Sequence, residues 1–285
     1  MDVIAGVSGH TGAATAEALL SRGRKVRVVV RSAQKGERWK ERGCEVAVAD
    51  LADPAALARA LEGAEGAYLL SPPDYAAKDF LADRKAFLDR LVEGVKRSRL
   101  RSIVFLSSIG AQHPAGTGPI VTLHRAEQAL RGVAPSVTFV RAAYFLENWG
   151  SVVPVAKARG VLPHFGPVGV RFPQVCARDI GAAAAAALVA PAEGTRVVEL
   201  AGQQDWSVEE VAAAVGELLG KPVKAVGAPL ESARAGLEQA GLPPEMARLF
   251  AEMYAGIASG LVAFERPQAV TRGSTPLVDA LRAIV

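Results

Sequence analysis

A turn punctuated by glycines, close to the first residue, constrains this chain more than any other stretch. Gly6-Val7-Ser8-Gly9-His10-Thr11-Gly12 follows a short apolar run and precedes an alanine-rich, helix-prone segment. Gly6 permits a tight turn out of a strand, Gly9 lets the backbone approach a pyrophosphate, and Gly12 allows close packing of helix on sheet. The free N–H groups at such a helix start bind phosphates. The spacing predicts a dinucleotide-binding turn, with an ordinary strand-to-helix turn as the alternative.

Strand and helix patterns alternate after this turn. The predicted strands cover residues 26–30, 43–49, 66–70, 102–106, 136–141 and 196–200, and the predicted helices include 13–21, 78–97, 124–131 and 181–192. Such alternation builds a parallel sheet through right-handed crossovers. We therefore predict an α/β fold with a doubly wound parallel sheet.

Local signals mark further boundaries. Asp53-Pro54 predicts an N-cap and a first-turn proline, and Ser207-Val208-Glu209-Glu210 is a capping box for a helix that reaches Leu219. Prolines and glycines are frequent between residues 154 and 173, which predicts irregular structure or a lid on the substrate side. The tail from Leu230 onward is expected to be mostly helical.

Composition excludes several classes of protein. The 285 residues include 33 basic and 29 acidic side chains without long blocks of either sign, which argues against a dedicated nucleic-acid surface. Cys44 and Cys176 lie outside any C-x-x-C pattern, so we expect reduced thiols in a cytoplasm and neither a disulfide nor a metal site. No apolar tract reaches about 20 residues, and the early turn at Gly6 leaves no room for a secretory signal. We therefore expect no membrane association.

The end of the second predicted strand bears on cofactor choice. A carboxylate there would bind the ribose 2′-hydroxyl of NAD, but the residue is Arg31, with Lys35 one turn further on. A guanidinium can bind a 2′-phosphate through two hydrogen bonds. The pattern favours NADP(H), with NAD(H) still possible, unless Arg31 is simply a solvent-exposed strand end. Asp50, at the end of the third strand, would lie near the adenine or would cap the next turn.

Polar and aromatic residues follow three of the predicted strands. In an open parallel sheet the ligand crevice lies outside the carboxyl ends of the strands. Ser71, Ser107, Ser108, Ala143 and Tyr144 are therefore expected to converge on one cleft. Four aromatic residues are candidates for an apolar pocket there, or for the core: Phe145, Trp149, Phe165 and Phe172.

With these residues assembled, the sequence resembles the NmrA-like family of atypical short-chain dehydrogenase/reductases. The matching stretches span roughly the first two thirds of the chain: residues 6–12, 26–31, 49–54, 69–73, 105–108, 138–148 and 179–181. The resemblance implies a Rossmann domain over residues 1–150, with residues 175–202 contributing to it. It also implies a smaller C-terminal α/β lobe over 151–285 and an NADP(H) site between the two.

Matched by position, the family's cofactor contacts fall on particular residues. The resemblance places Gly9, His10, Thr11 and Gly12 on the pyrophosphate and Arg31 and Lys35 on the 2′-phosphate. It places Asp50 and Leu51 by the adenine, Leu70 and Ser71 along the ribose, and Ala143, Tyr144 and Phe145 beside the nicotinamide. Gly6, Ser8, Pro72 and Ser107 complete the predicted cofactor-binding set.

One departure from fully active short-chain dehydrogenases limits the chemistry. Those enzymes use a Tyr-x-x-x-Lys pair to transfer a proton while hydride moves, but residues 119–128 contain neither tyrosine nor lysine. His124 is then the candidate proton donor, because histidine titrates in the useful range, although it could be a helix-start residue only. Tyr144 and Asn148 are the other catalytic candidates, and Tyr144 could equally be a core aromatic.

Two functions remain open at this stage. The first is an NADPH-dependent oxidoreductase that passes hydride to a small apolar acceptor such as a quinone, in which charge is delocalised and less proton assistance is needed. The second is a non-catalytic NADP(H)-binding redox sensor that acts through a protein partner. The predicted oligomeric state is a monomer or a homodimer.

Overall fold

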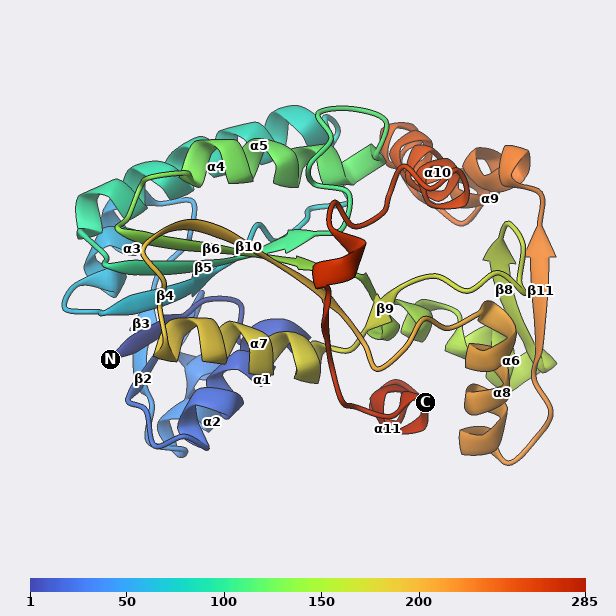
Figure 1. The fold of residues 1–285 in the computed structure, drawn as a ribbon, viewed down its shortest axis with the longest axis horizontal. Helices are drawn as coiled ribbons and strands as arrows, with labels where there is room; N and C mark the ends of the chain where they lie inside the picture. Colours follow the sequence, from blue (N-terminus) through green and yellow to red (C-terminus); the bar gives the residue numbers. More distant parts are fainter.

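The computed structural model describes residues 1–285 around one eight-stranded sheet (Figure 1). The strand order is β12-β10-β6-β5-β4-β1-β2-β3, and all neighbours are parallel. The order reverses at β1, which lies between β2 and β4, and ligands bind at such a reversal. The strands are β1 (Asp2–Ile4), β2 (Val26–Val30), β3 (Glu45–Val48), β4 (Gly66–Leu69), β5 (Ser102–Ser108), β6 (Ser136–Ala142), β10 (Gly194–Ala201) and β12 (Thr271–Arg272). This confirms the predicted doubly wound α/β fold.

Helices cover both faces of the sheet (Figure 1). One face carries α3 (Pro54–Leu61), α4 (Phe80–Ser98) and α5 (Val121–Leu130), and the other carries α1 (His10–Leu20), α2 (Glu37–Lys40) and α7 (Ala177–Val189). Adjacent strand residues therefore enter different cores: Val28 packs with α1 and α7, and Val29 with α3 and α4. Burial on both faces explains the continuous apolar runs of the central strands.

The glycine turn folds as its sequence requires. Gly6 has a φ of 71°, a conformation that favours glycine. A Cβ atom on Gly12 would lie 2.4 Å from the carbonyl of Gly6, so this residue lets α1 approach the turn. Close packing recurs behind it, where a Cβ atom on Gly181 of α7 would lie 2.4 Å from the backbone of Ala14 in α1.

Several predicted boundaries are confirmed. The strand at 26–30 has the predicted ends, and β5 runs two residues beyond the predicted one. The Asp53 carboxylate accepts hydrogen bonds from the N–H groups of Ala55 and Ala56, and Ser207 and Glu210 form the reciprocal capping box of α8 (Val208–Leu219). The helix predicted from residue 13 begins earlier, at His10, because α1 starts directly at the glycine turn. Both cysteines are buried free thiols.

The prediction for residues 154–173 is wrong over about half its length. This stretch contains most of α6 (Val153–Arg159) and all of β8 (Val161–Phe165), which pairs with β11 (Lys224–Ala228). Gly160 ends α6 with a φ of 66°, which allows the chain to enter β8 at once. A second small pair joins β7 (Tyr144–Phe145) to β9 (Gln174–Val175). Only residues 166–173 lack regular structure, apart from one bridge at Phe172.

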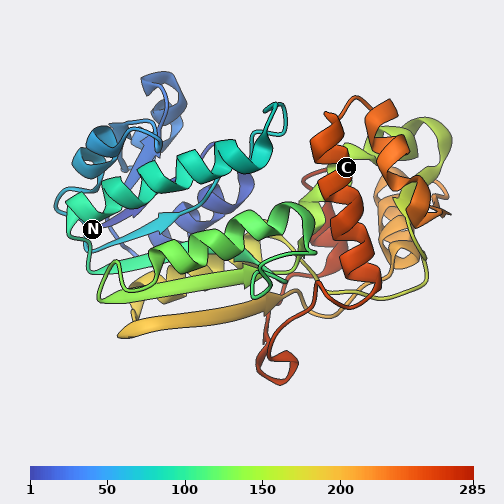
Figure 2. The same cartoon turned by 90° about the horizontal axis from the view of Figure 1, so that it is seen from above.

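The tail is mostly helical, as predicted, with α9 (Ala233–Gln239), α10 (Pro244–Ala258) and α11 (Leu277–Leu281). Seen from above, α9 and α10 stand together with α6 and α8 beyond the carboxyl ends of the central strands (Figure 2). The chain then returns to the sheet edge as β12. None of the helices combines the length and apolar character that a membrane span needs.

Candidate functional site

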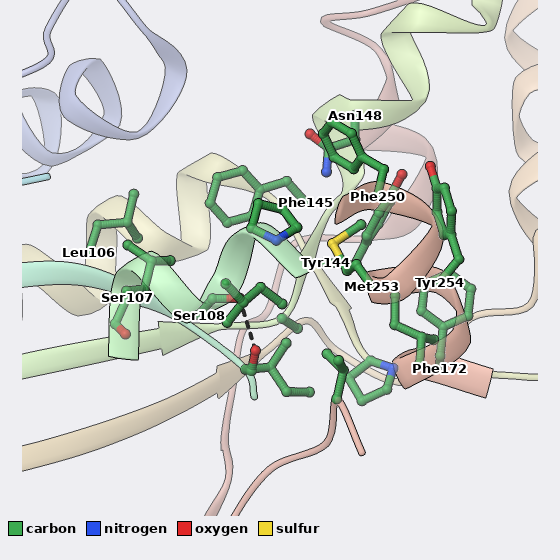
Figure 3. A pocket seen from close by; sticks show the side chains of 18 of the residues that line it. Leu106, Ser107, Ser108, Tyr144, Phe145, Asn148, Phe172, Phe250, Met253 and Tyr254 are labelled. Atoms are coloured by element: carbon green, nitrogen blue, oxygen red, sulfur yellow. Dashed lines mark hydrogen bonds between the residues drawn. The ribbon is translucent and has the colours of Figure 1, made fainter. Parts of the chain in front are cut away.

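A cavity of about 1040 Å³ opens at the carboxyl ends of β4, β5 and β6 (Figure 3). Its sheet-side wall includes Ser71 after β4, Ser107 and Ser108 at the end of β5, and Ala143 and Tyr144 after β6. These five residues were expected to share one cleft, and they do. Parallel strands end at the same edge of a sheet, so residues far apart in sequence meet there.

The opposite wall comes from the C-terminal part of the chain. Phe250, Met253, Tyr254 and Ile257 of α10 line the cavity, and their spacing places them on one helix face. The helix is held in place where the Glu245 carboxylate accepts a 2.6 Å hydrogen bond from the N–H of Phe80, at the start of α4. The sequence analysis missed all four residues. Their apolar spacing was visible, but nothing in it showed what the face covers.

Three aromatic rings of the cavity lining, Tyr144, Phe172 and Tyr254, pack on two further rings, Trp149 and His164, that do not line it. Tyr144 packs against Trp149 at 5.8 Å and against Phe172 at 5.7 Å between ring centroids. Phe172 stacks on His164 at 6.3 Å, and His164 meets the edge of Tyr254 at 6.0 Å. Burial lowers the pKa of His164, so this imidazole is neutral at physiological pH. The rings therefore make a rigid apolar surface suited to a planar ligand.

The cavity has charged side chains, but each cation is paired. Arg171 donates to Glu210 at 3.1 Å, Arg272 donates to Asp205 at 2.6 Å, and Arg84 donates to its neighbour Asp83 at 3.0 Å. These arginines therefore leave no free positive charge for an anionic ligand. The lining favours an uncharged molecule.

The hydroxyl protons of Ser107 and Ser108 are also committed. Ser107 donates at 2.6 Å to Glu127, which itself lies in a buried ion pair with Arg141, and Ser108 donates at 3.0 Å to the carbonyl of Ile109. Polar hydrogens that can meet a ligand remain on the three phenols of the lining, Tyr75, Tyr144 and Tyr254, and on Ser71 and Asn148. Tyr144, Asn148 and Tyr254 are labelled in Figure 3.

The phenols of Tyr144 and Tyr254 hold their protons at neutral pH. Burial raises the pKa of Tyr144 strongly, the nearby phenols of Tyr254 and Tyr75 add to the rise, and a hydrogen bond with Asn148 opposes it. Burial is the main cause that raises the pKa of Tyr254, and the nearby Tyr75 adds to the rise. Protonated phenols are hydrogen-bond donors, so Tyr144 and Tyr254 can each donate to the contents of the cavity.

The glycine turn lies beside this cavity and is open to a ligand. Gly9 precedes α1 in an extended conformation without a side-chain cap, so the first N–H groups of the helix have no partner within it. A Cβ atom on Gly9 would meet only the Gly6 oxygen, at 3.5 Å. Thr11 lines the cavity itself. The turn and the cavity thus form one path from a helix N-terminus to the ends of β4, β5 and β6, which fits an extended dinucleotide.

A buried carboxylate lies on this path. Glu147 lines the large cavity and also a second one beside Ser8, Gly9 and His10. One of its oxygens accepts a 2.8 Å hydrogen bond from the N–H of Ala177, while the other is buried without a partner. An unpartnered buried oxygen is costly, and a bound ligand with a hydroxyl or amide donor would satisfy it.

The predicted adenosine-side residues lie at the ends of β2 and β3. Arg31 directly follows β2 and Lys35 lies in the next helical turn, and both are exposed. Asp50 is also exposed and accepts a hydrogen bond from the N–H of Ala52, and Leu51 is half-buried. Arg38 was not predicted. Its guanidinium donates to the carbonyl of Val7 at 2.6 Å and lines the second cavity, adding a cation beside the turn.

Some candidates lie outside the cavity lining. His124 follows the lining residues Thr122 and Leu123 on α5, and its Nδ1 lies 2.9 Å from the carbonyl of Ala111. One further residue along a helix turns the side chain by about 100°, so the arrangement gives no support to His124 as proton donor. Pro72 is exposed, and of the four candidate aromatics Phe145 and Phe172 line the cavity, whereas Trp149 and Phe165 do not.

Comparison with known proteins agrees with this architecture. A model of the NmrA-like family matches residues 3–260. The chain is 26% identical over 256 residues to the NAD(P)H azoreductase of Xenophilus azovorans, covering 90% of this chain and 86% of the relative. It is 26% identical over 266 residues to quinone oxidoreductase 2 of Escherichia coli (strain K12), covering 91% of this chain and 89% of the relative.

Solved structures show the same fold. A crystal structure of an NADPH-dependent quinone oxidoreductase from Escherichia coli, complexed with NADPH, superposes with a TM-score of 0.82 at 24% identity, over 100% of this chain and 99% of that one. The triphenylmethane reductase of Citrobacter sp. superposes with a TM-score of 0.81 at 20% identity, over 99% and 98% of the two chains.

Proposed function

Because the chain belongs to the NmrA-like family, we propose that it is an NADPH-dependent oxidoreductase that passes hydride to a small apolar acceptor such as a quinone. One observation carries this proposal: a large apolar cavity adjoins the glycine turn, and the hydrogen-bond donors it leaves free are neutral hydroxyl and amide groups, mainly phenols. The azoreductase and quinone oxidoreductase among its relatives are named for acceptors of this kind.

The chain's own residues would hold NADPH in an extended pose. In this proposal the amides of His10, Thr11 and Gly12 bind the pyrophosphate, and Arg31 and Lys35 bind the 2′-phosphate. The remaining predicted contacts in this proposal are Gly6, Ser8, Gly9, Asp50, Leu51, Leu70, Ser71, Pro72, Ser107, Ala143, Tyr144 and Phe145. When bound, NADPH supplies the hydride.

The proton comes from a phenol in this scheme, because the Tyr-x-x-x-Lys pair is missing. Tyr144 keeps its proton at neutral pH and can donate it to an oxygen that becomes negative. Its hydrogen bond with Asn148 stabilises the phenolate that remains. The aromatic walls exclude water and align a planar ring, which supplies catalysis through positioning.

The decisive test measures the oxidation of NADPH by the purified protein with a panel of benzoquinones and naphthoquinones. Turnover that saturates with quinone, and that falls in the Tyr144→Phe variant without loss of NADPH affinity, is the expected result. Tight NADPH binding without turnover on any acceptor would refute the enzyme and leave the redox sensor that acts through a protein partner. We also propose that the protein acts in the cytoplasm, as a monomer or a homodimer.

A further inference from the structure

Tyr254 reaches the candidate site from a distant part of the chain. It lies on α10, 110 residues after Tyr144, and lines the same cavity. The two side chains are close enough that Tyr254 contributes to the raised pKa of Tyr144. Figure 3 shows both side chains at the aromatic end of the cavity. The fold therefore brings a phenol of α10 to the cavity that already contains the one following β6.

The Tyr254 ring is held firmly in place. It packs against His164 at 6.0 Å and against Phe165 at 5.9 Å, both from β8. The helix that carries it packs closely on the turn at Gly118, where a Cβ atom would be 2.0 Å from the Leu249 carbonyl, and the Glu245 carboxylate ties its first turn to Phe80. A fixed ring gives a fixed hydroxyl position, which reduces the entropy lost on binding a ligand.

The Tyr254 hydroxyl has no other evident task. Burial and the neighbouring Tyr75 shift its pKa upward, and no hydrogen bond contributes to that shift. Tyr144 differs, because Asn148 stabilises its phenolate. A phenol without such a partner keeps its proton and donates a hydrogen bond to whatever occupies the cavity.

We propose that Tyr254 donates a hydrogen bond to an oxygen of the bound acceptor and so selects acceptors that carry a carbonyl over hydrocarbons of the same outline. The proposal rests on the proposed function and refines its substrate class. In the overall reaction NADPH gives two electrons as hydride and becomes NADP⁺, and the quinone gains that hydride and one proton from Tyr144. The Tyr144 phenolate then takes up one proton from the solvent, so each turnover consumes one solvent proton. Tyr254 keeps its own proton throughout, so its contribution is to binding.

The test compares two ligands with the same ring outline, 2-methyl-1,4-naphthoquinone and 2-methylnaphthalene. Their dissociation constants are measured by titration calorimetry or tryptophan fluorescence, without NADPH, on the wild type and on Tyr254→Phe. The variant keeps the ring that packs on His164. Loss of one neutral hydrogen bond should weaken quinone binding about fivefold and leave hydrocarbon binding unchanged. In turnover, KM for the quinone should rise by a similar factor while kcat stays constant.

Met253→Ala provides the matched control. Met253 lines the cavity from the same helix but has no donor, so this variant should weaken both ligands equally. Equal loss of both ligands in Tyr254→Phe would mean that the residue only shapes the wall, and unchanged affinity for both would mean that it touches neither. Either result overturns the proposal, as does a wild type that binds no quinone. Quinone binding without any turnover instead refutes the proposed function, and the ligand comparison still tests Tyr254.

Discussion

Replacing two glycines of the same turn by alanine should affect different properties: Gly12→Ala should lower stability, and Gly9→Ala should weaken NADPH binding. A Cβ atom on Gly12 would lie 2.4 Å from the carbonyl carbon and oxygen of Gly6 and 2.5 Å from the oxygen of Ala5, and all three are backbone atoms. Ordinary contact needs at least 3.4 Å, so Gly12→Ala must push α1 about 1 Å away from the turn. On Gly9 the nearest atom would be 3.5 Å away, which is ordinary contact.

The expected magnitudes follow from these contacts. Gly12→Ala should lower the free energy of unfolding by about 3 kcal/mol, at the upper end of overpacking costs, and Tm by roughly 5 °C for a chain of this length. Gly9→Ala should cost less than about 1 kcal/mol of stability, because its extended backbone suits alanine. It should nevertheless weaken NADPH about tenfold or more, since a methyl group would hold the pyrophosphate away from the helix amides.

Thermal unfolding and calorimetric titration with NADPH, each on both variants, separate the two roles. The reasoning is refuted if Gly12→Ala is as stable as the wild type, or if Gly9→Ala binds NADPH with wild-type affinity. The second outcome would show that the turn packs the fold and does not approach a phosphate.

Three further predictions concern charge and protons. Arg31→Asp should weaken NADPH by about 1–3 kcal/mol and leave NADH nearly unchanged in parallel titrations, whereas an equal loss for both cofactors would show that Arg31 is not the selector. Glu127→Ala should lower the free energy of unfolding in urea by about 3 kcal/mol, because Arg141, 3% exposed, then loses its bidentate partner. Tyr144→Phe should lower kcat about 10²-fold. Because the raised pKa keeps this phenol protonated, wild-type kcat should stay constant from about pH 6 to about pH 9, and a fall within that range would point to another acid.

The sequence predicted helices and strands well where interactions between residues close in the chain determine them. Val26–Val30 is a β-branched run buried on both faces, and the Ser207 capping box satisfies N–H groups within four residues. The pattern misled where a chain rich in proline and glycine still forms short strands. β8 contains Pro163 and still pairs with β11, because a proline can be accommodated in a strand at the edge of a sheet. Nothing in the local sequence of β8 indicates that β11 is its partner.

The site also contains a part that the sequence predicted and a part that it did not. The positions of Ser71, Ser107, Ala143 and Tyr144 after predicted strands indicated that they share one cleft, because parallel strands place their carboxyl ends at one edge of the sheet. The sequence could not reveal Tyr254 or Phe250, because their helix is placed beside the cavity by contacts with distant residues such as Phe80 and Gly118, more than 130 residues earlier. It also favoured His124 for its chemistry, whereas helix geometry turned that ring toward the carbonyl of Ala111.

The sequence alone determined that this chain forms a parallel sheet with a turn able to hold a dinucleotide, because glycine conformations and strand periodicity act over a few residues. The tertiary structure alone decided what closes the cavity and which polar hydrogens remain free inside it. Those depend on which distant residues pair, since a serine that donates its one proton to a neighbour has none left for a ligand, and an arginine beside a carboxylate has its charge balanced. The conformation of the glycine turn therefore follows from the residues of the turn itself. Which hydrogen-bond donors face the cavity beside it depends on the whole fold.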